Sequence, residues 1–526
     1  MRLEPGTTST KDTAERFQSI LASKDLTLYK VSQKSEVLYG HASPYFLPHN
    51  LYYDLRHGTF SPSIYQLSTL SLVSGYRLMD WLRVFGFYLD DIPRLQVLLP
   101  SRRTVLLDSS LDDPNAWVPW VENRVVNTRV PPIAPLMQLL EFTHHRRLGA
   151  ISEISNQGLL YAKIGEEDVL AFPDLVPGSI VRVNPRVDSG LAIRTNDTTS
   201  DRMFLIEHCK GLCCCRLRVI GNNLIVPVST QLSYAQIELQ LPREARLLGI
   251  VDLEIRPLLK AKQPEVPKEL AKHWKPEPLA PESTVGELLR SSRAKMNLSL
   301  REASAMSRHI VEILGDRRYF VSPSSLSDYE VLDTPPRHFH KSVTLCSLYG
   351  LQFHGFLKVI GIELESLGQE PMPDRFVDRA FLQRSVDNPP RVGFLEELLK
   401  ECGGIPFFLR DSVQGISGLP DVSLDDLFWT GGERNALHPY LINAMVVVVN
   451  RRKRKPQHFN SKPLWQQPLY VILKRDGTYL CACCGTENGT LVVHPYSRQF
   501  YRPTQLRYHQ DAEIVGQVVT IVRRLL

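Results

Sequence analysis

The chain contains no apolar run long enough to cross a membrane. Its most apolar stretch covers residues 441–449, whereas a membrane-spanning helix needs about 20 apolar residues. The first residues, 1–6, are polar and lack the apolar core of a secretion signal. We therefore expect a cytoplasmic protein without a membrane partner, in which residues 441–449 form a buried strand.

Cysteine and net charge are also sparse. The 526 residues include nine cysteines, several of them adjacent, which is not the spacing of a secreted disulfide framework. The formal net charge of +6 is a mild basic excess, so it permits contact with nucleic acid without indicating it. The hydrophobic share of 43% is ordinary for a globular chain, and the length suggests about three to four domains.

Two stretches about 275 residues apart read as the same helix-rich module written twice. In the first, residues 51–58 are followed by a proline and then by residues 82–87. In the second, residues 326–330 are followed by a proline and then by residues 357–362. A duplicated helical module within one chain imitates a two-fold dimer.

Each helical stretch is followed by a β-rich stretch. Short runs of Val, Ile and Leu separated by turn residues, as at 179–183 and 445–449, are typical of a small barrel-like β domain. The sequence therefore predicts an α+β fold with several domains, in which a helical domain and a small β-rich domain are repeated in tandem. The predicted segments are a helical domain at residues 14–90, a helical connector at 91–150, a β domain at 151–257, a Lys/Pro-rich linker at 258–282, a second helical domain at 283–368, a connector at 369–404 and a second β domain at 405–526.

Residues 298–303 read as a helix capped by Ser299, and Thr27 is suited to the same capping role in the first copy. Residues 326–330 read as the next helix, and the turn between the two helices is roughly a dozen residues longer than in simple helix-turn-helix proteins. This pattern resembles the lambda-repressor-like, or Xre-family, helix-turn-helix with a long turn. The resemblance implies that the third helix of each module lies in the major groove of double-stranded DNA, with its N-terminal residues against base edges.

An ungapped alignment from Asp54 and Asp328 pairs His49, Asn50 and Tyr53 with Pro323, Ser324 and Ser327, which makes the first copy the richer reader. In the second copy Arg56 becomes Glu330, and Asp333 adds negative charge near the expected phosphates. Leu28 and Leu300 stand where the family usually has a polar phosphate contact, so that contact must come from Tyr29, Lys30 or Arg301, or be absent. The predicted DNA-binding residues are Tyr29, Lys30, His49, Asn50, Tyr53, Arg56, Arg301, Ser324 and Ser327.

Residues 170–178 and 436–441, together with the cysteine-rich residues 212–217 and 480–484, resemble the C-terminal domain of LexA-like repressors. Active members of that family cut themselves with a Ser nucleophile and a Lys base. The resemblance puts Leu170 and Ala436 at the nucleophile position, and Cys215 and Cys483 at the base position. Because neither copy has a hydroxyl and an amine there, Ser–Lys acyl chemistry is excluded. We expect no enzyme and no cofactor, but a domain kept for pairing, which also allows further self-association.

The cysteine clusters leave a second interpretation open. Cys213 and Cys215 share one face of a strand, as do Cys481 and Cys483, because side chains alternate along a strand. If the two β domains pack symmetrically, these four thiols could converge on a tetrahedral zinc or an iron–sulfur cluster and serve in metal or redox sensing. The alternative is that each Cys is a small buried hydrophobe in a core strand.

The basic residues 451–455 have two interpretations as well. A solvated loop is the default for such a charge run, and a phosphate clamp is the alternative.

Together these patterns predict a bacterial transcription regulator: a single-chain pseudo-dimer of helix-turn-helix and inactive LexA-like domains that binds an asymmetric DNA site. The main alternative is a protein-interaction scaffold that has lost DNA binding. A self-cleaving protease is disfavoured by Leu170 and Ala436.

Overall fold

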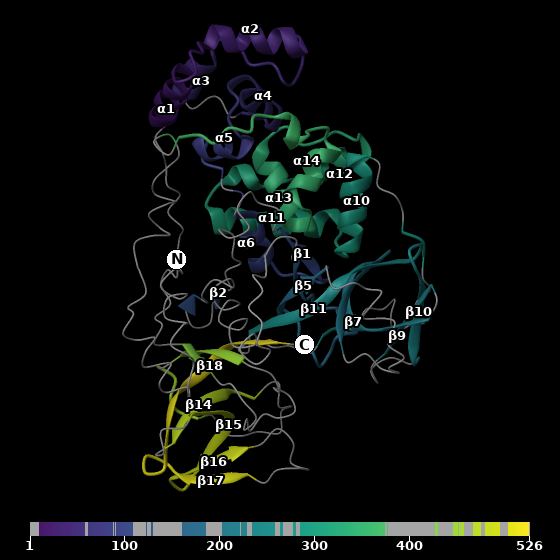
Figure 1. The fold of residues 1–526 in the computed structure, drawn as a ribbon, viewed down its shortest axis with the longest axis vertical. Coiled ribbons are helices and arrows are strands. Elements are labelled where there is room, and N and C mark those ends of the chain that lie inside the picture. The colour runs from purple at the N-terminus through teal and green to yellow at the C-terminus, as the bar shows by residue number, and fades with distance from the viewer. Residues whose placement is uncertain are drawn as a thin grey trace, which may run out of the picture. The chain divides into compact units, whose positions relative to one another are not determined.

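The computed structural model describes part of the chain with secondary structure and contacts (Figure 1). The described residues are 10–57, 62–87, 89, 91–108, 122–123, 128–129, 160–185, 202–220, 222–228, 234–257, 264–266, 277–279, 284–373, 376, 427–429, 445–450, 452–456, 467–474, 479–494 and 503–524. They have both helices and strands and form several domains, so the predicted α+β class is confirmed.

The chain divides into two compact units, each assembled from separate stretches. The helical unit comprises Met1–Pro100, Leu106–Trp117 and Ala280–Gln383, and the β unit comprises Ser101–Val105, Val118–Leu279 and Arg384–Leu526. Segments that the sequence analysis treated as consecutive domains therefore join in pairs. The two predicted helical domains belong to one unit, and the two predicted β domains belong to the other.

The helical unit contains two sets of five α-helices. The first set is α1 (Thr10–Ala22), α2 (Leu28–Tyr39), α3 (Leu51–Arg56), α4 (Ile64–Ser74) and α5 (Leu78–Val84), followed by α6 (Asp91–Leu98). The second set is α10 (Val285–Lys295), α11 (Leu300–Leu314), α12 (Pro323–Val331), α13 (Phe339–Tyr349) and α14 (Phe353–Val359), with short 3-10 turns η1 (Arg317–Tyr319) and η2 (Leu364–Ser366).

Local sequence explains where these helices begin and end. The Thr27 hydroxyl accepts a hydrogen bond from the Lys30 amide and caps α2, and Ser299 caps α11 in a reciprocal pair with Glu302. Both predicted N-caps are confirmed. Helices α4 and α13 end alike, at Gly75 and Gly350, which take the left-handed conformation that glycine adopts without steric cost.

The same hydrogen bonds recur in both sets between the second helix and the segment that follows it. The Ser35 hydroxyl donates to the Ser32 carbonyl and accepts from the Leu47 amide, at 2.8 and 3.1 Å. The Ser307 hydroxyl likewise donates at 2.7 Å to the carbonyl of Ser304 and accepts at 3.1 Å from the amide of Val321. In each set a buried serine therefore ties the long turn to the second helix.

The fourth helix of each set holds that turn from the other side. Thr69 donates to the Tyr45 carbonyl at 2.8 Å, and Thr344 donates to the Tyr319 carbonyl at 2.7 Å. The Tyr45 ring packs edge-on against Tyr65 at 4.9 Å between centroids, and Tyr319 packs edge-on against His340 at the same distance. An imidazole in the second set thus occupies the place of a phenol in the first.

The β unit is built on one extended sheet. Its described strands follow the order β1-β4-β5-β11-β18-β14-β15-β16-β17, with β12, β13, β6 and β7 paired beside this path. The strands are β1 (Val105–Leu107), β4 (Leu160–Lys163), β5 (Ile180–Asn184), β6 (Met203–His208), β7 (Gly211–Arg216), β11 (Ala245–Pro257), β12 (Leu427–Trp429), β13 (Met445–Asn450), β14 (Leu469–Lys474), β15 (Tyr479–Glu487), β16 (Thr490–His494), β17 (Thr504–Arg507) and β18 (Ala512–Arg524). Two small sheets contain β8 (Arg218–Ile220), β9 (Asn223–Pro227) and β10 (Gln236–Gln240), and β2 (Glu122–Asn123) with β3 (Thr128–Arg129).

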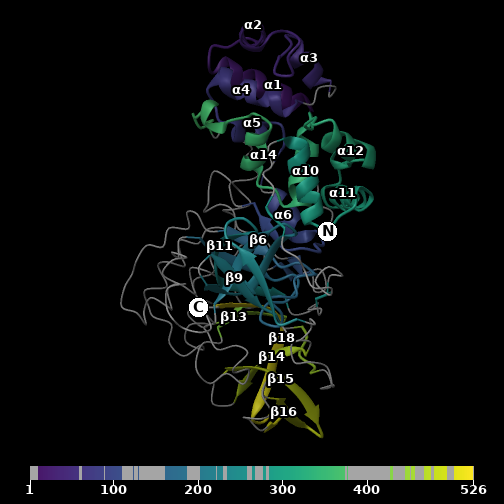
Figure 2. The same cartoon turned by 90° about the vertical axis from the view of Figure 1, so that its right-hand side faces the viewer.

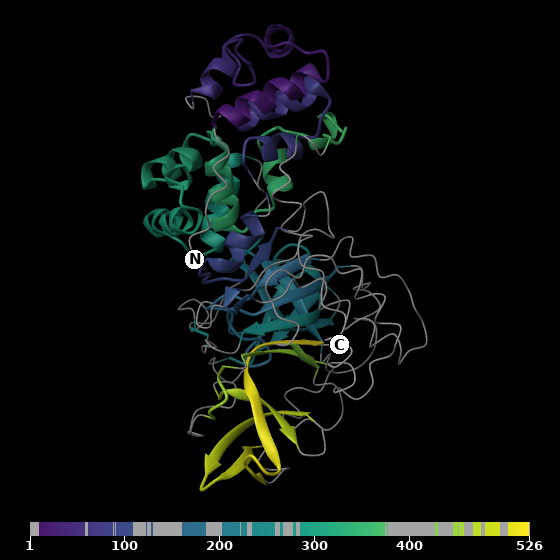
Figure 3. The same ribbon diagram turned by 90° about the vertical axis from the view of Figure 1, so that its left-hand side faces the viewer.

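The two long strands β11 and β18 have the same neighbours in their respective halves. Strand β11 pairs with β5 and β6, and β18 pairs with β13 and β14, in each case antiparallel and with a register shift along the strand. The two strands also pair with each other, antiparallel, with Ile255 opposite Val522. Figure 3 shows β18 as the long yellow strand of this junction. One continuous ladder therefore joins the two β-rich halves.

The buried imidazole of His340 predicts that acid destabilises the helical unit. Burial lowers the pKa of His340 to about 4 from its usual 6.5, so the unfolded chain takes up this proton before the folded chain does. Stability is then lost as pH falls from about 6.5 through about 4, by about 2 to 3 kcal/mol from this group. His340→Tyr, which copies Tyr65, should remove that part of the slope when urea unfolding is followed across this pH range.

The exposed His309 on α11 provides the control. His309→Gln should leave the pH slope of the wild-type protein in place. Identical slopes for the wild type and His340→Tyr would contradict the assignment of acid sensitivity to this buried ring.

Candidate nucleic-acid interface

Helix α3 presents one polar and aromatic face to solvent. Leu51 and Leu55 are buried, whereas Tyr53 is 63% exposed and His49, Asn50 and Arg56 are exposed. The apolar pair recurs at helical spacing and fixes the helix against the core. The predicted first-copy residues His49, Asn50, Tyr53 and Arg56 are therefore all accessible to a partner.

Helix α12 repeats this burial pattern. Leu326 and Glu330 are buried, whereas Ser324, Asp328 and Val331 are exposed. Exposed and buried positions match those of α3 when Leu326 is set opposite Leu51, which is one residue away from the ungapped alignment.

That alignment is therefore wrong by one residue. Tyr53 corresponds to the exposed Asp328 rather than to Ser327, which is half-buried, and Arg56 corresponds to Val331 rather than to Glu330. The physical reason is that the apolar anchors set which side of a helix faces inward. In the second set an acid, Asp328, stands at the exposed central position of the helix.

Contacts within each third helix orient its exposed side chains. The Asn50 amide donates to the Asp54 carboxylate at 3.0 Å, and the Tyr53 ring stacks on the His57 ring at 4.0 Å between centroids. The Ser322 hydroxyl caps α12 by accepting a hydrogen bond from the Ser325 amide, and the Ser324 hydroxyl lies 2.9 Å from the Ser322 hydroxyl. The first surface is thus aromatic and amide-rich, and the second offers small hydroxyls.

The second helices supply the flanking positions. Tyr29 is 71% exposed, Arg301 is exposed, and the Lys30 ammonium donates to the Asp25 carbonyl at 3.2 Å at the start of α2. All three were predicted as phosphate contacts, and all three lie at the N-terminal ends of their helices, where backbone N–H groups favour anions.

Glu330 has a different role from the one that the sequence suggested. Its carboxylate is buried and makes a bidentate ion pair with Arg293 of α10, at 2.7 Å for each hydrogen bond. The predicted charge of Glu330 near phosphates is therefore wrong, because that carboxylate is buried and paired with Arg293. Asp333 accepts a hydrogen bond from the Gly286 amide at 2.7 Å, in the first turn of α10, but it is exposed, so its effect on phosphates stays a prediction.

In the first set, apolar residues stand at the two positions of this ion pair. The Leu26 amide donates to the Leu21 carbonyl, and the Leu298 amide makes the same bond to the Arg293 carbonyl, so Leu21 occupies the position of Arg293. Because Leu55 occupies the position of Glu330, an apolar pair of residues in one set corresponds to an ion pair in the other.

In Figure 2 α3 and α12 are both seen along the right-hand side of the helical unit, whereas in Figure 1 α3 lies at its upper left and α12 at its right. The start of α4 and the start of α13 meet between the two sets: Ser63 and His338 form an antiparallel bridge, and the Ile64 amide donates to the Arg337 carbonyl at 3.3 Å. Corresponding residues thus face one another across the junction, as around a two-fold axis.

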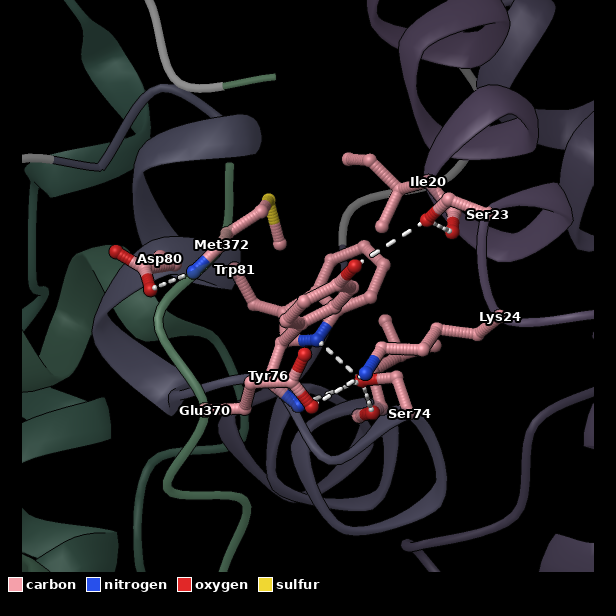
Figure 4. Close-up of polar contacts among 10 residues, drawn as sticks. Ile20, Ser23, Lys24, Ser74, Tyr76, Asp80, Trp81, Glu370 and Met372 are labelled. Atoms are coloured by element: carbon pink, nitrogen blue, oxygen red, sulfur yellow. Dashed lines mark hydrogen bonds and ion pairs between the residues drawn. The ribbon is translucent and has the colours of Figure 1, made fainter. Parts of the chain in front are cut away.

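A segment that follows the second set crosses onto the first (Figure 4). Glu370 forms a parallel bridge with Tyr76, and its carboxylate forms an ion pair with Lys24. The Met372 amide donates to the Asp80 carboxylate at 2.9 Å. Residues 368–372 are therefore fixed to α1, α4 and α5 of the first set.

The first set makes the reciprocal connection. The Gln96 amide of α6 donates to the Cys346 carbonyl of α13 at 3.1 Å, and the Asp108 carboxylate accepts from the Phe353 amide of α14 at 2.8 Å. The Phe87 and Phe339 rings pack at 4.5 Å between centroids. Each set is thus held by the segment that follows the other.

In the β unit, Leu170 packs against an apolar cluster that includes Cys213 and Cys215. Its predicted counterpart Ala436 lies outside the described residues. Cys214 lies opposite Leu205, and Leu205 in turn pairs with Gly249 at the bulge of β11. Cys481 lies opposite Val471, and Val471 pairs with Gly516 at the bulge of β18. By this register Ala482, rather than Cys483, corresponds to Cys215.

The cysteines are part of two separate cores. Cys213 and Cys215 belong to the cluster around Phe204, whereas the cluster around Tyr470 contains Cys484. Burial raises the pKa of Cys483 and Cys484 to about 12, so both thiols stay protonated. Among the described residues no group of three or more His, Cys, Asp or Glu could hold a metal, and the proposed convergence of four thiols is not formed.

A small cavity lies beside Asp168, between β7 and the segment that carries Thr104. Asp168 accepts hydrogen bonds from the Thr104 hydroxyl at 2.6 Å and from the Cys214 amide at 3.0 Å. Burial raises its pKa to about 6. The cavity volume of about 20 Å³ fits about one water molecule, so we assign no ligand to it.

Of the predicted basic loop, Arg452, Lys453, Arg454 and Lys455 are exposed, and Arg451 lies outside the described residues. Exposure of these side chains is expected both for a solvated loop and for a phosphate clamp.

No protein-family model matches the chain, and no curated protein matches it by sequence. None of the described helices is both long and apolar enough to span a bilayer.

The ion pair of α12 predicts an unequal response to substitution. Glu330→Gln leaves the half-buried Arg293 without its charge partner, and we expect a loss of about 3 kcal/mol in the free energy of unfolding. The double variant Arg293→Leu/Glu330→Leu copies the residues of the first set and should recover most of this loss. Urea unfolding of the three proteins measures both effects, and a double variant no more stable than the single one would contradict the correspondence.

Proposed function

We propose that the protein is a sequence-specific DNA-binding transcription regulator whose single chain carries two helix-turn-helix readers. One observation carries this proposal: α3 and α12 belong to one helical unit, bury equivalent positions and expose equivalent ones. A recognition helix enters the major groove with a polar side toward the DNA, while its apolar side packs against the protein core. The recurring Ser35 and Ser307 contacts support treating the two sets as copies of one module.

Phosphate contacts would come from the N-terminal ends of the second helices, through Tyr29, Lys30 and Arg301. Such contacts set register and most of the affinity, whereas base contacts set sequence. Asn50 and Tyr53 give α3 amide and aromatic groups for base edges. Ser324 gives α12 a hydroxyl, and Asp328 opposes close approach to phosphates. The two half-sites are therefore read unequally.

The β unit would serve as an inactive pairing domain rather than a catalyst. Support comes from the ladder between β11 and β18, which joins the two β-rich halves, and from Leu170 and Cys215, which offer neither hydroxyl nor amine. A cytoplasmic location and further self-association belong to the same proposal.

A protein-binding role for α12 is the second candidate. Val331 and Leu332 at its C-terminal end are 67% and 66% exposed, and large exposed apolar side chains favour protein partners over nucleic acid. Binding to genomic fragments at several salt concentrations separates the two. A regulator shows steep salt dependence and a preferred fragment, and a scaffold shows neither.

Selection of binding sites from random DNA tests the proposal directly. We expect an asymmetric site, with one half strongly specified by α3 and the other weakly specified by α12. Asn50→Ala should relax specificity in the strong half and weaken binding by about tenfold or more, because a good base contact contributes about 1 to 3 kcal/mol of discrimination. Affinity is measured by fluorescence anisotropy on the selected site.

Gln240→Ala is the matched control, since it removes an amide that is also exposed, from β10 in the other unit. It should leave affinity and specificity unchanged. Recovery of perfect inverted repeats would count against unequal readers, and equal effects of Asn50→Ala and Gln240→Ala would count against α3 as a reader.

A further inference from the structure

We propose that residues 368–372 are a clamp that sets the half-site spacing accepted by the two readers. This inference rests on the proposed function and adds to it a spacing-determining segment that contacts no DNA. The segment follows the second helical set in the chain but is bound to the first. It thereby determines how far α3 can move from α12.

Backbone hydrogen bonds hold the clamp at both ends of its central residue. The Glu370 amide donates to the Gly75 carbonyl at 3.0 Å, and the Arg77 amide donates to the Glu370 carbonyl at 3.0 Å. The Gly368 amide donates to the Ser71 hydroxyl at 3.2 Å. A segment paired in this way cannot slide without breaking several bonds together.

Gly368 is required by close approach to the first set. A Cβ atom at this position would lie 2.4 Å from the Gly75 carbonyl carbon and 2.4 Å from the Tyr76 carbonyl oxygen. Both are backbone atoms at the end of α4, so they have no rotamer with which to move aside. Any larger residue must therefore push the clamp away from α4.

Side chains complete the attachment (Figure 4). Lys24 pairs with the Glu370 carboxylate and lies 4.5 Å above the centre of the Tyr76 ring. Met372 is buried, and its amide is bound by the buried Asp80 carboxylate. The Lys24–Glu370 pair is partly exposed and contributes modestly, so the backbone pairing and the burial of Met372 carry most of the attachment.

The reciprocal contacts of Asp108 and Gln96 with the second set prevent a hinge at the opposite end. With both crossings in place, the separation and the relative rotation of the third helices are fixed. Two half-sites on one face of B-DNA lie about 34–36 Å, or about 10 to 10.5 base pairs, apart. A site lengthened by about half a turn turns one half-site to the opposite face.

The experiment compares wild type and Gly368→Ala on two DNA probes, one with the selected spacing and one with about five base pairs added. We expect wild type to bind the longer probe at least about tenfold more weakly. Gly368→Ala should bind the two probes within about threefold of each other, through weaker binding to the selected spacing. Gly355→Ala is the control, because a Cβ there meets open space in α14.

A second pair of variants does not disturb packing. Glu370→Gln removes the clamp's charge, and Glu365→Gln removes an equal charge from a carboxylate without a hydrogen bond or ion pair among the described residues. We expect a partial loss of spacing preference in the first and none in the second. Far-UV circular dichroism verifies that each protein is folded.

The effect of the clamp can also be measured without DNA. Spin labels on encoded non-natural residues at positions 53 and 324 report the distance between α3 and α12 in the free protein. We expect a single narrow distribution in wild type and a broad one in Gly368→Ala. Unchanged spacing preference with an unchanged distribution overturns the clamp while leaving DNA binding intact. Absence of specific DNA binding by wild type overturns the proposed function, and the spacing role with it, whatever the distances show.

Discussion

Backbone pairing between segments far apart in sequence is the constraint on which the rest of this structure depends. Tyr76 bridges to Glu370, Ser63 bridges to His338, and β11 pairs with β18. Closing such long loops costs conformational entropy that grows only slowly with length, and several pairings share that cost. The pairings of Ser63 with His338 and of β11 with β18 join corresponding parts of the two halves, and all three pairings help to decide which faces stay exposed. The contact between the two helical sets at Ser63 and His338 leaves one side of α3 and one side of α12 exposed to solvent.

The sequence predicted the local structure well because caps and apolar spacing act over a few residues. Thr27 and Ser299 cap the expected helices. The alignment of the third helices failed by one residue. It matched two aspartates by identity, whereas burial aligns Leu51 with Leu326. Identity of an exposed acid carries little structural weight, and the anchoring apolar residue carries most of it.

Long-range contacts could not be predicted from the sequence. Glu330 looked like a charge facing phosphate, and only the position of Arg293 on another helix shows that it is buried in an ion pair. Alternation along a strand suggested that the four thiols could converge, but the sequence did not reveal that β7 pairs with β6 and β15 with β14. Residues 369–372 were assigned to a connector, and Gly368 to the end of the second helical domain, since the clamp has no helical or strand pattern of its own. Their conformation is fixed by the surface that they contact.

The ladder between β11 and β18 has a consequence for how such a protein would act at low abundance. An ordinary two-subunit regulator dissociates when it is diluted, so its occupancy of a site falls more steeply than its concentration. Here the second half is covalently attached, and its effective concentration near the first is set by the length of the chain, in the millimolar range for short flexible connections. Assembly therefore makes no demand on copy number, and a few molecules per cell would already be fully paired.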